Sequence, residues 1–444
     1  MTTSAQLDRA AKFLTLRRVR AHATILAVCL WGVCAVDFLV PGSFDRAGNI
    51  KFQDFLSFYI SGKLIAQGRA ADLYNQPARD AEMLAIVQTH VATDAFVRLD
   101  NANPVSHEST IPPTTPTNVR LPNLYGPQFS LLFVPLTRLP FMIAAQVWVA
   151  LSLICFFACI HLVLTSCPSL LPYSRTVMLC AVAFPPLFHF FVRGQNSVLV
   201  LLCFTAAYLS FRTQHNWLVG IALGFLIFKP PFLVAIPVVL LLAQTWKPLV
   251  ALLVSAAAQL AFTRIYFGSA VMHAYFATLC HISRAIDTAE LSLAPIQMHS
   301  LRSFWSLLIP WPGVALVLYA VSSIVIIVMA AAAWRSSAPL ALRFSALTLA
   351  AVLVNPHLFV YDLLVLAPVL LLVVDWTLTN PQHPSSSALR VLAYLSFLLP
   401  LFGPLCQWTH VQLSVPAFTV LLWLLWRSSE TPSHKLASNE SRVV

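Results

Sequence analysis

The chain has 444 residues, of which 59% are hydrophobic and only 10% are charged, and its mean hydropathy is +0.78. A soluble globular chain carries roughly 25% charged residues, so the composition excludes an ordinary soluble protein. The net charge of +11 does not indicate nucleic-acid binding, because the basic residues lie mostly in short connections between apolar runs. That pattern is typical of membrane topology, with some affinity for anionic lipid.

The apolar runs predict about twelve membrane spans, and the absence of alternation at period two indicates that they are helices. The fifth and sixth predicted spans are short and meet at Lys229-Pro230-Pro231, as one broken helix or two half-spans. We therefore predict an all-α polytopic membrane protein forming a single membrane domain, residues 1–444. The spans are expected to start near residues 21, 141, 174, 196, 217, 231, 248, 313, 340, 360, 389 and 411.

The first apolar run, Ala21 to Val40, follows three arginines and resembles a signal peptide. Its length and the many spans after it favour an uncleaved first helix. With the N-terminus inside, the short outer loops carry only Arg193 and Lys229 as basic residues, which agrees with the positive-inside rule. An even number of spans then places both termini, including the tail 428–444, in the cytoplasm.

Two long segments are predicted to face outward, residues 41–128 and residues 268–312. Within the first, Pro77 to Gln88 has a helix-start signal and an apolar side. We expect an amphipathic helix there that can lie on the membrane surface.

Asp54 follows the first span within an aromatic stretch, Phe52 to Tyr59. A carboxylate in such surroundings can accept a proton from a substrate hydroxyl. The alternative is a helix cap or a loop salt bridge, because carboxylates outside the membrane are common.

Arg193-Gly194-Gln195-Asn196 connects the third and fourth predicted spans. An arginine at an outer helix end can pair with a phosphate or carboxylate through two hydrogen bonds, and glycine lets a ligand approach the backbone. An interfacial arginine reaching lipid headgroups is the alternative.

Lys229 lies deep in apolar sequence, between Phe228 and two prolines. A lysine near a helix centre costs about 2.5–3.5 kcal/mol on insertion scales, so we expect an anionic partner. A functional role is favoured here, since prolines free backbone carbonyls where a helix breaks around a ligand.

Asn355-Pro356-His357 precedes Tyr361-Asp362 at the outer start of the tenth predicted span. If the helix begins that early, His357 and Tyr361 share a face. A histidine can contact a phosphate or transfer a proton near neutral pH. The alternative is a polar cap in which Asp362 occupies the positive end of the helix.

The predicted topology places Asp54, Arg193, Lys229, His357 and Asp362 on the outer side, although they come from five distant stretches. Together they suit a site that holds an anionic, phosphate-bearing lipid at the outer leaflet and activates a hydroxyl. The sequence has no Walker loop, no dinucleotide glycine pattern, no nucleotide-sugar domain and no Cys/His metal spacing. We therefore predict no cofactor and no metal site, leave a divalent cation open, and expect membrane lipids rather than nucleic acid as partners.

Several short motifs, in their order and spacing, resemble glycosyltransferase family 87 over about residues 50 to 375. The motifs are Asp54-Phe55 with Tyr59, Gly62, Gly68 and Asp72-Leu73-Tyr74, then Tyr125-Gly126-Pro127, Leu139-Pro140, Gly194-Gln195-Asn196, Lys229-Pro230, and Pro356-His357 with Tyr361-Asp362-Leu363. The resemblance implies a GT-C fold and a polyprenyl-phosphate-sugar donor, as in mannosyltransferases and arabinofuranosyltransferases. Two departures bear on acceptor choice: Gly126 replaces a frequent proline, and the preceding loop is long.

The resemblance implies that Asp54 is the general base of an inverting transfer, and that His357 contacts the donor phosphate or sugar. Arg193 and Lys229 are candidates for stabilising the leaving phosphate. The remaining candidates are Gln195 and Asn196 for donor binding, and Tyr59, Tyr125, Tyr361 and Asp362 in supporting roles.

The implied function is transfer of mannose, another hexose or arabinofuranose to a lipid- or glycan-linked hydroxyl at the outer face of a bacterial inner membrane. The alternatives are a secondary transporter or lipid flippase, which a broken helix around Lys229 would also suit, and a non-catalytic scaffold. The transferase is favoured because the charged groups gather at outer helix ends rather than at the bilayer midplane.

Overall fold

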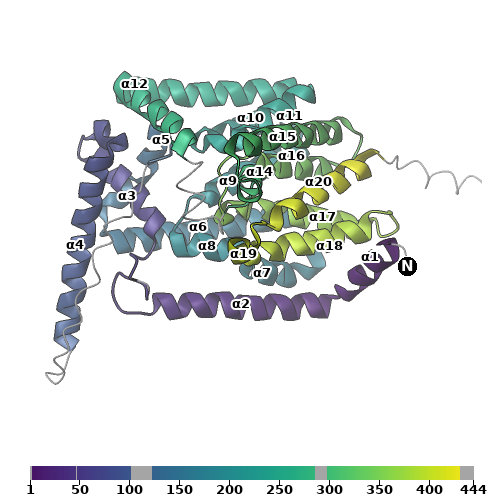
Figure 1. The fold of residues 1–444 in the computed structure, drawn as a ribbon, viewed down its shortest axis with the longest axis horizontal. Helices are drawn as coiled ribbons and strands as arrows, with labels where there is room; N and C mark the ends of the chain where they lie inside the picture. Colours follow the sequence, from purple (N-terminus) through teal and green to yellow (C-terminus); the bar gives the residue numbers. More distant parts are fainter. Residues whose placement is uncertain (1–2, 47, 102–122, 286–297, 431–444) are drawn as a thin grey trace, which may run out of the picture.

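The computed structural model describes residues 3–46, 48–101, 123–285 and 298–430. Within these ranges the protein is helical, and its only β structure is a pair of isolated bridges, Phe44 to Ile50 and Met298 to Phe359. Most of the long helices run side by side, while α4 lies across one end (Figure 1). The all-α prediction is confirmed for the described residues.

The α-helices follow the chain in a simple order. They are α1 Thr3–Phe13, α2 Leu16–Phe38, α3 Gln53–Ala66, α4 Gln76–Asn101, α5 Pro127–Ser130, α6 Phe141–Leu164, α7 Ser174–Val182, α8 Pro185–Arg193, α9 Ser197–Arg212, α10 Asn216–Gly224, α11 Ile236–Leu242, α12 Trp246–Ala285, α14 Leu301–Leu308, α15 Pro312–Arg335, α16 Leu340–Leu353, α17 Leu366–Thr379, α18 Ser386–Leu398, α19 Cys406–Thr409 and α20 Ser414–Glu430. The 3-10 helices between them are η1 Ala70–Tyr74, η2 Leu131–Phe133, η3 Pro135–Arg138, η4 Leu171–Tyr173, η5 Phe225–Phe228, η6 Pro230–Leu233, η8 Val360–Val365 and η9 Leu399–Leu405.

Six helices of the described residues are long and apolar enough to cross a membrane, or seven if the bent pair Leu171–Val182 and Pro185–Arg193 is one span. A helical segment lies at each of the twelve predicted positions, but several have only 10–17 residues. Because a spanning helix needs about 20 residues, twelve crossings are not confirmed. The short apolar helices are Ser197–Arg212, Asn216–Phe228, Pro230–Leu242 and Leu340–Leu353.

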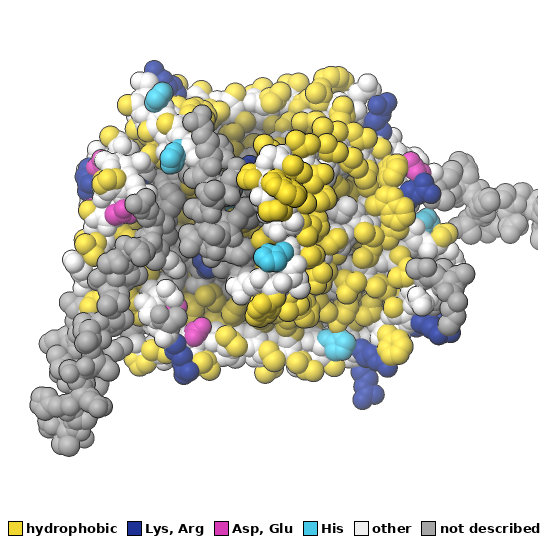
Figure 2. All heavy atoms as spheres, viewed as in Figure 1, with side chains coloured by type: hydrophobic (Ala, Val, Ile, Leu, Met, Phe, Trp, Pro, Cys, Tyr) yellow, Lys and Arg dark blue, Asp and Glu magenta, His cyan; other side chains and the backbone are white. Residues whose placement is uncertain are grey.

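Hydrophobic side chains cover much of the visible face of the molecule, with Lys and Arg at its margins (Figure 2). Large apolar side chains are exposed on helices far apart in the chain, such as Ile25 of α2, Ile265 of α12 and Val317 of α15. Exposed apolar surface of this extent needs a non-aqueous neighbour. The apolar helices therefore indicate a membrane protein.

The predicted break at Lys229 is confirmed. Helix α10 gives way to η5, and Lys229 has non-helical backbone angles (φ −130°, ψ 72°) before Pro230 starts η6. Proline has no amide hydrogen and restricts the residue before it, so the helix cannot continue through this point. The break points the Lys229 side chain into the protein interior, where it is 8% exposed.

Lys51 fixes the end of α2 to the start of α3. Its ammonium donates hydrogen bonds to the backbone carbonyls of Phe38, Val40 and Gly42, at 3.2, 2.7 and 2.7 Å. The side chain is buried, so these carbonyls satisfy a cation that would otherwise be unfavourable there. As a result, the first turn of α3 begins at a defined place beside α2.

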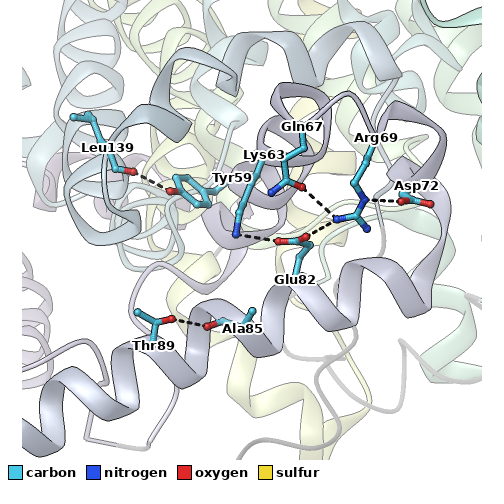
Figure 3. A network of polar contacts seen from close by, with 9 residues as sticks. All are labelled: Tyr59, Lys63, Gln67, Arg69, Asp72, Glu82, Ala85, Thr89 and Leu139. Atoms are coloured by element: carbon cyan, nitrogen blue, oxygen red, sulfur yellow. Dashed lines mark hydrogen bonds and ion pairs between the residues drawn. The ribbon is translucent and has the colours of Figure 1, made fainter.

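A helix is confirmed over Pro77 to Gln88, as part of the longer α4. On its predicted apolar side, Val87 is buried but Leu84 is exposed. Arg79 of α4 is fully buried, and its guanidinium donates to the hydroxyls of Ser57 and Ser61, both at 2.8 Å. A second set of contacts lies nearer the surface (Figure 3), where Glu82 of α4 accepts from Lys63 at 3.0 Å and from Arg69 at 2.6 Å. These contacts fix α4 against α3, whereas its placement on a membrane surface stays a prediction.

The two outward segments are only partly described. Residues 102–122 of the first and 286–297 of the second lie outside the described residues, as do residues 431–444 of the predicted tail. The second predicted segment begins as a helix, because α12 continues beyond a kink at Gly268 (φ 85°, ψ 172°). Only glycine adopts such angles readily, so the chain turns there and resumes its helix.

We expect the contact between α3 and α4 to weaken in acid. Burial raises the pKa of Glu82, but hydrogen bonds from Lys63 and Arg69 outweigh it and bring that pKa below its ordinary value of 4.5. A carboxyl with a lowered folded-state pKa stabilises fully above its unfolded pKa, and this stabilisation is lost as pH falls through the lower value.

Amide hydrogen exchange of α4, corrected for intrinsic pH dependence, measures this effect. Protection in the wild type should fall as pH is lowered from 4.5, whereas Glu82→Gln should show weaker protection with little change over the same range. Identical pH profiles for the two proteins would contradict the assignment.

Candidate active site

Asp54 lies in the first turn of α3, where the helix dipole favours a carboxylate. The Gln195 side-chain amide donates to its Oδ2 at 2.7 Å, and an Arg193 Nη1 lies 3.5 Å from its Oδ1. The side chain of Asp54 is 15% exposed and that of Arg193 is 31% exposed. Each carboxylate oxygen of Asp54 therefore has a polar neighbour that orients it, and the carboxylate is still partly accessible at the protein surface.

Gly194 lets the end of α8 approach the start of α3. It has φ +67°, and a Cβ built there would lie 2.9 Å from the Cβ of Phe55 and 3.3 Å from that of Phe52. Both the left-handed backbone and the close packing require glycine. The Trp148 indole donates to the carbonyls of Gly194 and Gln195, at 3.1 and 3.2 Å, and so fixes the turn that carries Arg193 and Gln195.

Lys229 forms a buried ion pair with Asp362, whose side chain is 1% exposed. Ser197 donates to the same carboxylate oxygen at 2.5 Å, and the backbone amide of Phe359 lies 3.4 Å from the other oxygen. The anionic partner expected for Lys229 is thus another part of the protein. Whether Lys229 also contacts a donor phosphate stays a prediction.

Asn196 links this ion pair to Asp54. Its side-chain oxygen lies 3.5 Å from the Lys229 ammonium, and its backbone amide donates to the Gln195 side-chain oxygen at 3.2 Å. Because Gln195 donates in turn to Asp54, polar contacts run without interruption from Asp54 to Asp362. We call the side chains of Asp54, Gln195, Asn196, Lys229 and Asp362 the polar chain.

Two tyrosines flank the polar chain. The Lys229 ammonium lies 6.0 Å from the ring centre of Tyr125 and 5.6 Å from that of Tyr361, within the range of cation–π attraction. Burial raises the pKa of Tyr125, and the negative charges of Asp362 and Asp54 add to this effect. The Tyr125 phenol therefore stays neutral and can donate a hydrogen bond to a bound anion.

A family model described as "Glycosyltransferase family 87" matches residues 123–361, which is more than half of the chain. The chain belongs to glycosyltransferase family 87. It is therefore a glycosyltransferase with membrane helices, which uses a sugar donor and an acceptor. Comparisons with curated proteins and with solved structures gave no match.

Family membership favours an enzyme over the transporter, flippase and scaffold hypotheses. The matched residues include Arg193, Gln195, Asn196 and Lys229 of the site, but Asp54 precedes them. The structure brings Asp54 to the matched segment through the contacts with Gln195 and Arg193.

His357 of this family 87 enzyme lies on the segment that leads into η8. Its backbone amide donates to the Asn355 side-chain oxygen at 2.8 Å, and its ring packs edge-on against Phe359 at 4.7 Å. Phe359 stacks in turn on Tyr361, at 5.3 Å between ring centres. His357 thus joins the site through a row of aromatic rings, and its contact with a donor stays a prediction.

Tyr59 has a different place from the other candidates. Its hydroxyl donates to the backbone carbonyl of Leu139 at 2.8 Å, which fixes α3 to the segment before α6. The supporting role of Tyr59 stays a prediction, and it would act through the position of α3.

His299 was not among the predicted site residues, although it lies beside them. It is fully buried, its backbone amide donates to Leu358 at 3.0 Å, and its Nδ1 lies 2.7 Å from the Ser414 hydroxyl. Burial lowers the pKa of His299 to about 3, and the charge of nearby His189 contributes. A neutral His299 therefore holds the segment of His357 against α20. No periodic pattern of residues indicates this contact.

Gly194→Ala tests the close approach of α8 to α3. The left-handed backbone alone should cost about 1–2 kcal/mol, and the contact with Phe55 should add to this. We expect a lower thermal unfolding temperature and a loss of sugar transfer, because Gln195 and Arg193 would move away from Asp54. Gly32→Ala is the control, since a Cβ there meets nothing within 4 Å and the residue is helical. Equal unfolding temperatures for both variants would refute the argument.

A double-mutant cycle tests the buried ion pair. Asp362→Asn should cost about 3–5 kcal/mol, because it leaves Lys229 buried without a counter-charge. Lys229→Met should also be destabilising, and the double variant should be less destabilised than the sum of the two. The measurement is equilibrium unfolding in mixed micelles. Additive effects would show that the two side chains do not interact.

Proposed function

We propose that this enzyme transfers a sugar from a polyprenyl-phosphate carrier to a hydroxyl of a lipid- or glycan-linked acceptor, with inversion at the anomeric carbon. The observation that carries the proposal is the accessible Asp54 carboxylate, oriented by Gln195 and paired with a partly exposed Arg193. A proton acceptor and a cation for phosphate thus lie side by side in a glycosyltransferase.

Asp54 is the general base of the proposed reaction. It takes the proton of the acceptor hydroxyl as the acceptor oxygen forms its bond to the anomeric carbon. The bond between that carbon and the phosphate oxygen breaks, and the electron pair leaves with polyprenyl phosphate. The products are the glycosylated acceptor, polyprenyl phosphate with one more negative charge, and protonated Asp54. Attack opposite the leaving group inverts the configuration.

Arg193 is the better candidate for stabilising the leaving phosphate. One of its five N–H donors points to Asp54, and the Arg193 side chain is 31% exposed, so the guanidinium can reach a phosphate outside the protein interior. Negative charge accumulates on the phosphate as the bond breaks, so a fixed cation there lowers the barrier.

Lys229 differs from Arg193, because Asp362 already compensates its charge. We assign it chiefly to orienting Asn196, whose side chain faces the same region as the Tyr125 and Tyr361 rings. Neutral phenols and an amide are suitable donors for sugar hydroxyls or phosphate oxygens, and His357 completes this set.

The proposed orientation places both termini in the cytoplasm and the site at the outer face of a bacterial inner membrane. The distribution of Lys and Arg supports this orientation, because the connections between helices at the end opposite the candidate site are basic. Mannose, another hexose and arabinofuranose are the candidate sugars.

Asp54→Asn tests the proposed function. Loss of a general base should lower the rate of transfer by about 10²–10⁴-fold while leaving donor binding intact. The assay uses vesicles reconstituted with labelled polyprenyl-phosphate mannose, glucose or arabinofuranose and with lipid or glycan acceptors. The anomeric configuration of the product reports inversion.

The matched control is Asp80→Asn, which removes a carboxylate on α4 that accepts a hydrogen bond from Gln76. It should transfer sugar at the wild-type rate. The proposal is overturned if the wild type neither transfers nor hydrolyses any donor, or if Asp54→Asn is as active as the wild type.

A further inference from the structure

A hollow lies away from the candidate site, among α2, α7, α17 and α18. It is a cavity of about 340 Å³ whose walls are mostly aliphatic and aromatic. Large apolar side chains at its rim are exposed, namely Leu16, Tyr173 and Leu378. The size lies within the range of known ligand pockets. The exposed rim shows that the cavity opens at the surface of the bundle.

The cavity is a slot along the bundle. A smaller hollow of about 60 Å³ shares part of its lining, including Val177, Cys180 and Phe397. Along α17, the combined lining reaches from Ala367 to Leu378. At 1.5 Å per residue this is about 16 Å, close to half of the roughly 30 Å hydrocarbon core of a bilayer. The slot therefore has the depth of one membrane leaflet.

The polar residues of the slot lie near one end. Each lies within the first two turns of its helix: Arg390 in α18, His22 in α2 and Thr176 in α7. Side-chain contacts join these starts, because the Arg20 guanidinium donates to Thr176 at 2.8 Å and His22 contacts Tyr394 at 2.5 Å. The helices therefore begin at the same end of the bundle.

That end is basic. Arg390 donates to the Thr377 carbonyl at 3.3 Å, and its Nε is buried with no hydrogen-bond partner among the described residues. Arg17, Arg18 and Arg175 are exposed on the same first turns. The nearby carboxylate of α17, Asp375, is engaged by two backbone amides, of Ser169 and Leu170, at 2.8 and 3.1 Å. A cationic rim above an apolar slot complements a lipid with an anionic head.

We propose that the slot binds one acyl chain of an anionic phospholipid, with its phosphate at Arg390 and Arg20. This lipid belongs to the leaflet opposite the candidate site, which is the cytoplasmic leaflet in the orientation proposed above.

The sugar donor is a different lipid. The helical segment from Asp362 at the candidate site to Thr377 at the rim of the slot is about 22 Å long. A phosphate at Arg390 therefore lies far from Asp54. The proposal does not depend on which sugar or acceptor the enzyme uses.

The bound lipid fills a gap beside α2. This helix is sparsely packed, with only 17% of its apolar stretch buried, and its partners in the described residues are chiefly α7 and α8. An acyl chain between α2, α7 and α18 adds apolar contacts that the protein itself does not supply. A ligand that binds only the folded state raises its stability.

Native mass spectrometry of the full-length protein tests the proposal, with phosphatidylglycerol and phosphatidylcholine titrated separately. We expect the wild type to bind phosphatidylglycerol at least tenfold more tightly than phosphatidylcholine. Arg390→Gln should remove most of this preference. Arg335→Gln, at the basic end of α15 and outside the slot, should keep it. Equal binding of the two lipids by the wild type, or an unchanged preference in Arg390→Gln, overturns the proposal.

Ala393→Trp fills the slot and should abolish tight binding of phosphatidylglycerol. Because this variant can fail to fold, the wild type offers a second measurement. Cys180 lines the slot, whereas Cys29 is exposed on α2 outside it. Phosphatidylglycerol should slow alkylation of Cys180 severalfold and leave Cys29 unchanged. Equal protection by phosphatidylcholine, no protection, or stronger protection by polyprenyl phosphate overturns the proposal. Failure of sugar transfer has no bearing on these outcomes.

Discussion

The burial of Lys229 is the constraint on which the candidate site depends. A lysine 8% exposed in an apolar interior needs an opposite charge, because an unpaired buried charge costs several kcal/mol. Asp362 supplies that charge, and Ser197 and Asn196 supply further polar contacts. Three segments must therefore meet: the start of α9, the break between η5 and η6, and η8. Their meeting point is one wall of the site.

The two ion pairs of the candidate site differ in how far they are exposed to solvent. The side chains of Lys229 and Asp362 are 9% and 1% exposed, so their attraction is little screened and their geometry is fixed. Arg193 and Asp54 are 31% and 15% exposed and 3.5 Å apart, so solvent screens them and a ligand can enter between or beside them. The proposed chemistry takes place at this open pair of Arg193 and Asp54. The polar chain through Gln195 and Asn196 lets the closed pair set the position of the open one.

Part of this arrangement could be predicted from the sequence. Apolar runs located the helices, and the cost of burying a lysine predicted that Lys229 has an anionic partner. The identity of that partner could not be predicted, because Asp362 lies 133 residues away and tertiary packing brings the two together. The predicted number of spans was less secure for a related reason. The sequence indicated that the two helices meeting at Lys229 are short, but hydropathy did not show that Ser197–Arg212 and Leu340–Leu353 are also shorter than a full span.

Side chains that bond to backbone groups were the hardest to predict. The Tyr59 hydroxyl contacts the carbonyl of Leu139, and the Lys51 ammonium contacts those of Phe38, Val40 and Gly42. A backbone carbonyl carries no sequence signal. Gly194 shows the opposite case. Its place between Arg193 and Gln195 indicated a close approach to the backbone, and the structure shows that Phe55 of α3 packs closely there.

Helix α2 connects the two ends of the molecule. At one end, Lys51 binds the carbonyls of Phe38, Val40 and Gly42 and so sets where α3, and with it Asp54, begins. At the other end, α2 forms a wall of the basic slot and makes few contacts with the rest of the bundle. A rigid helix transmits a shift at one end to the other, because its backbone hydrogen bonds resist compression and bending. A phospholipid that fills the slot would therefore steady the same helix that sets the start of α3, although it would lie at the opposite end of α2 from Asp54.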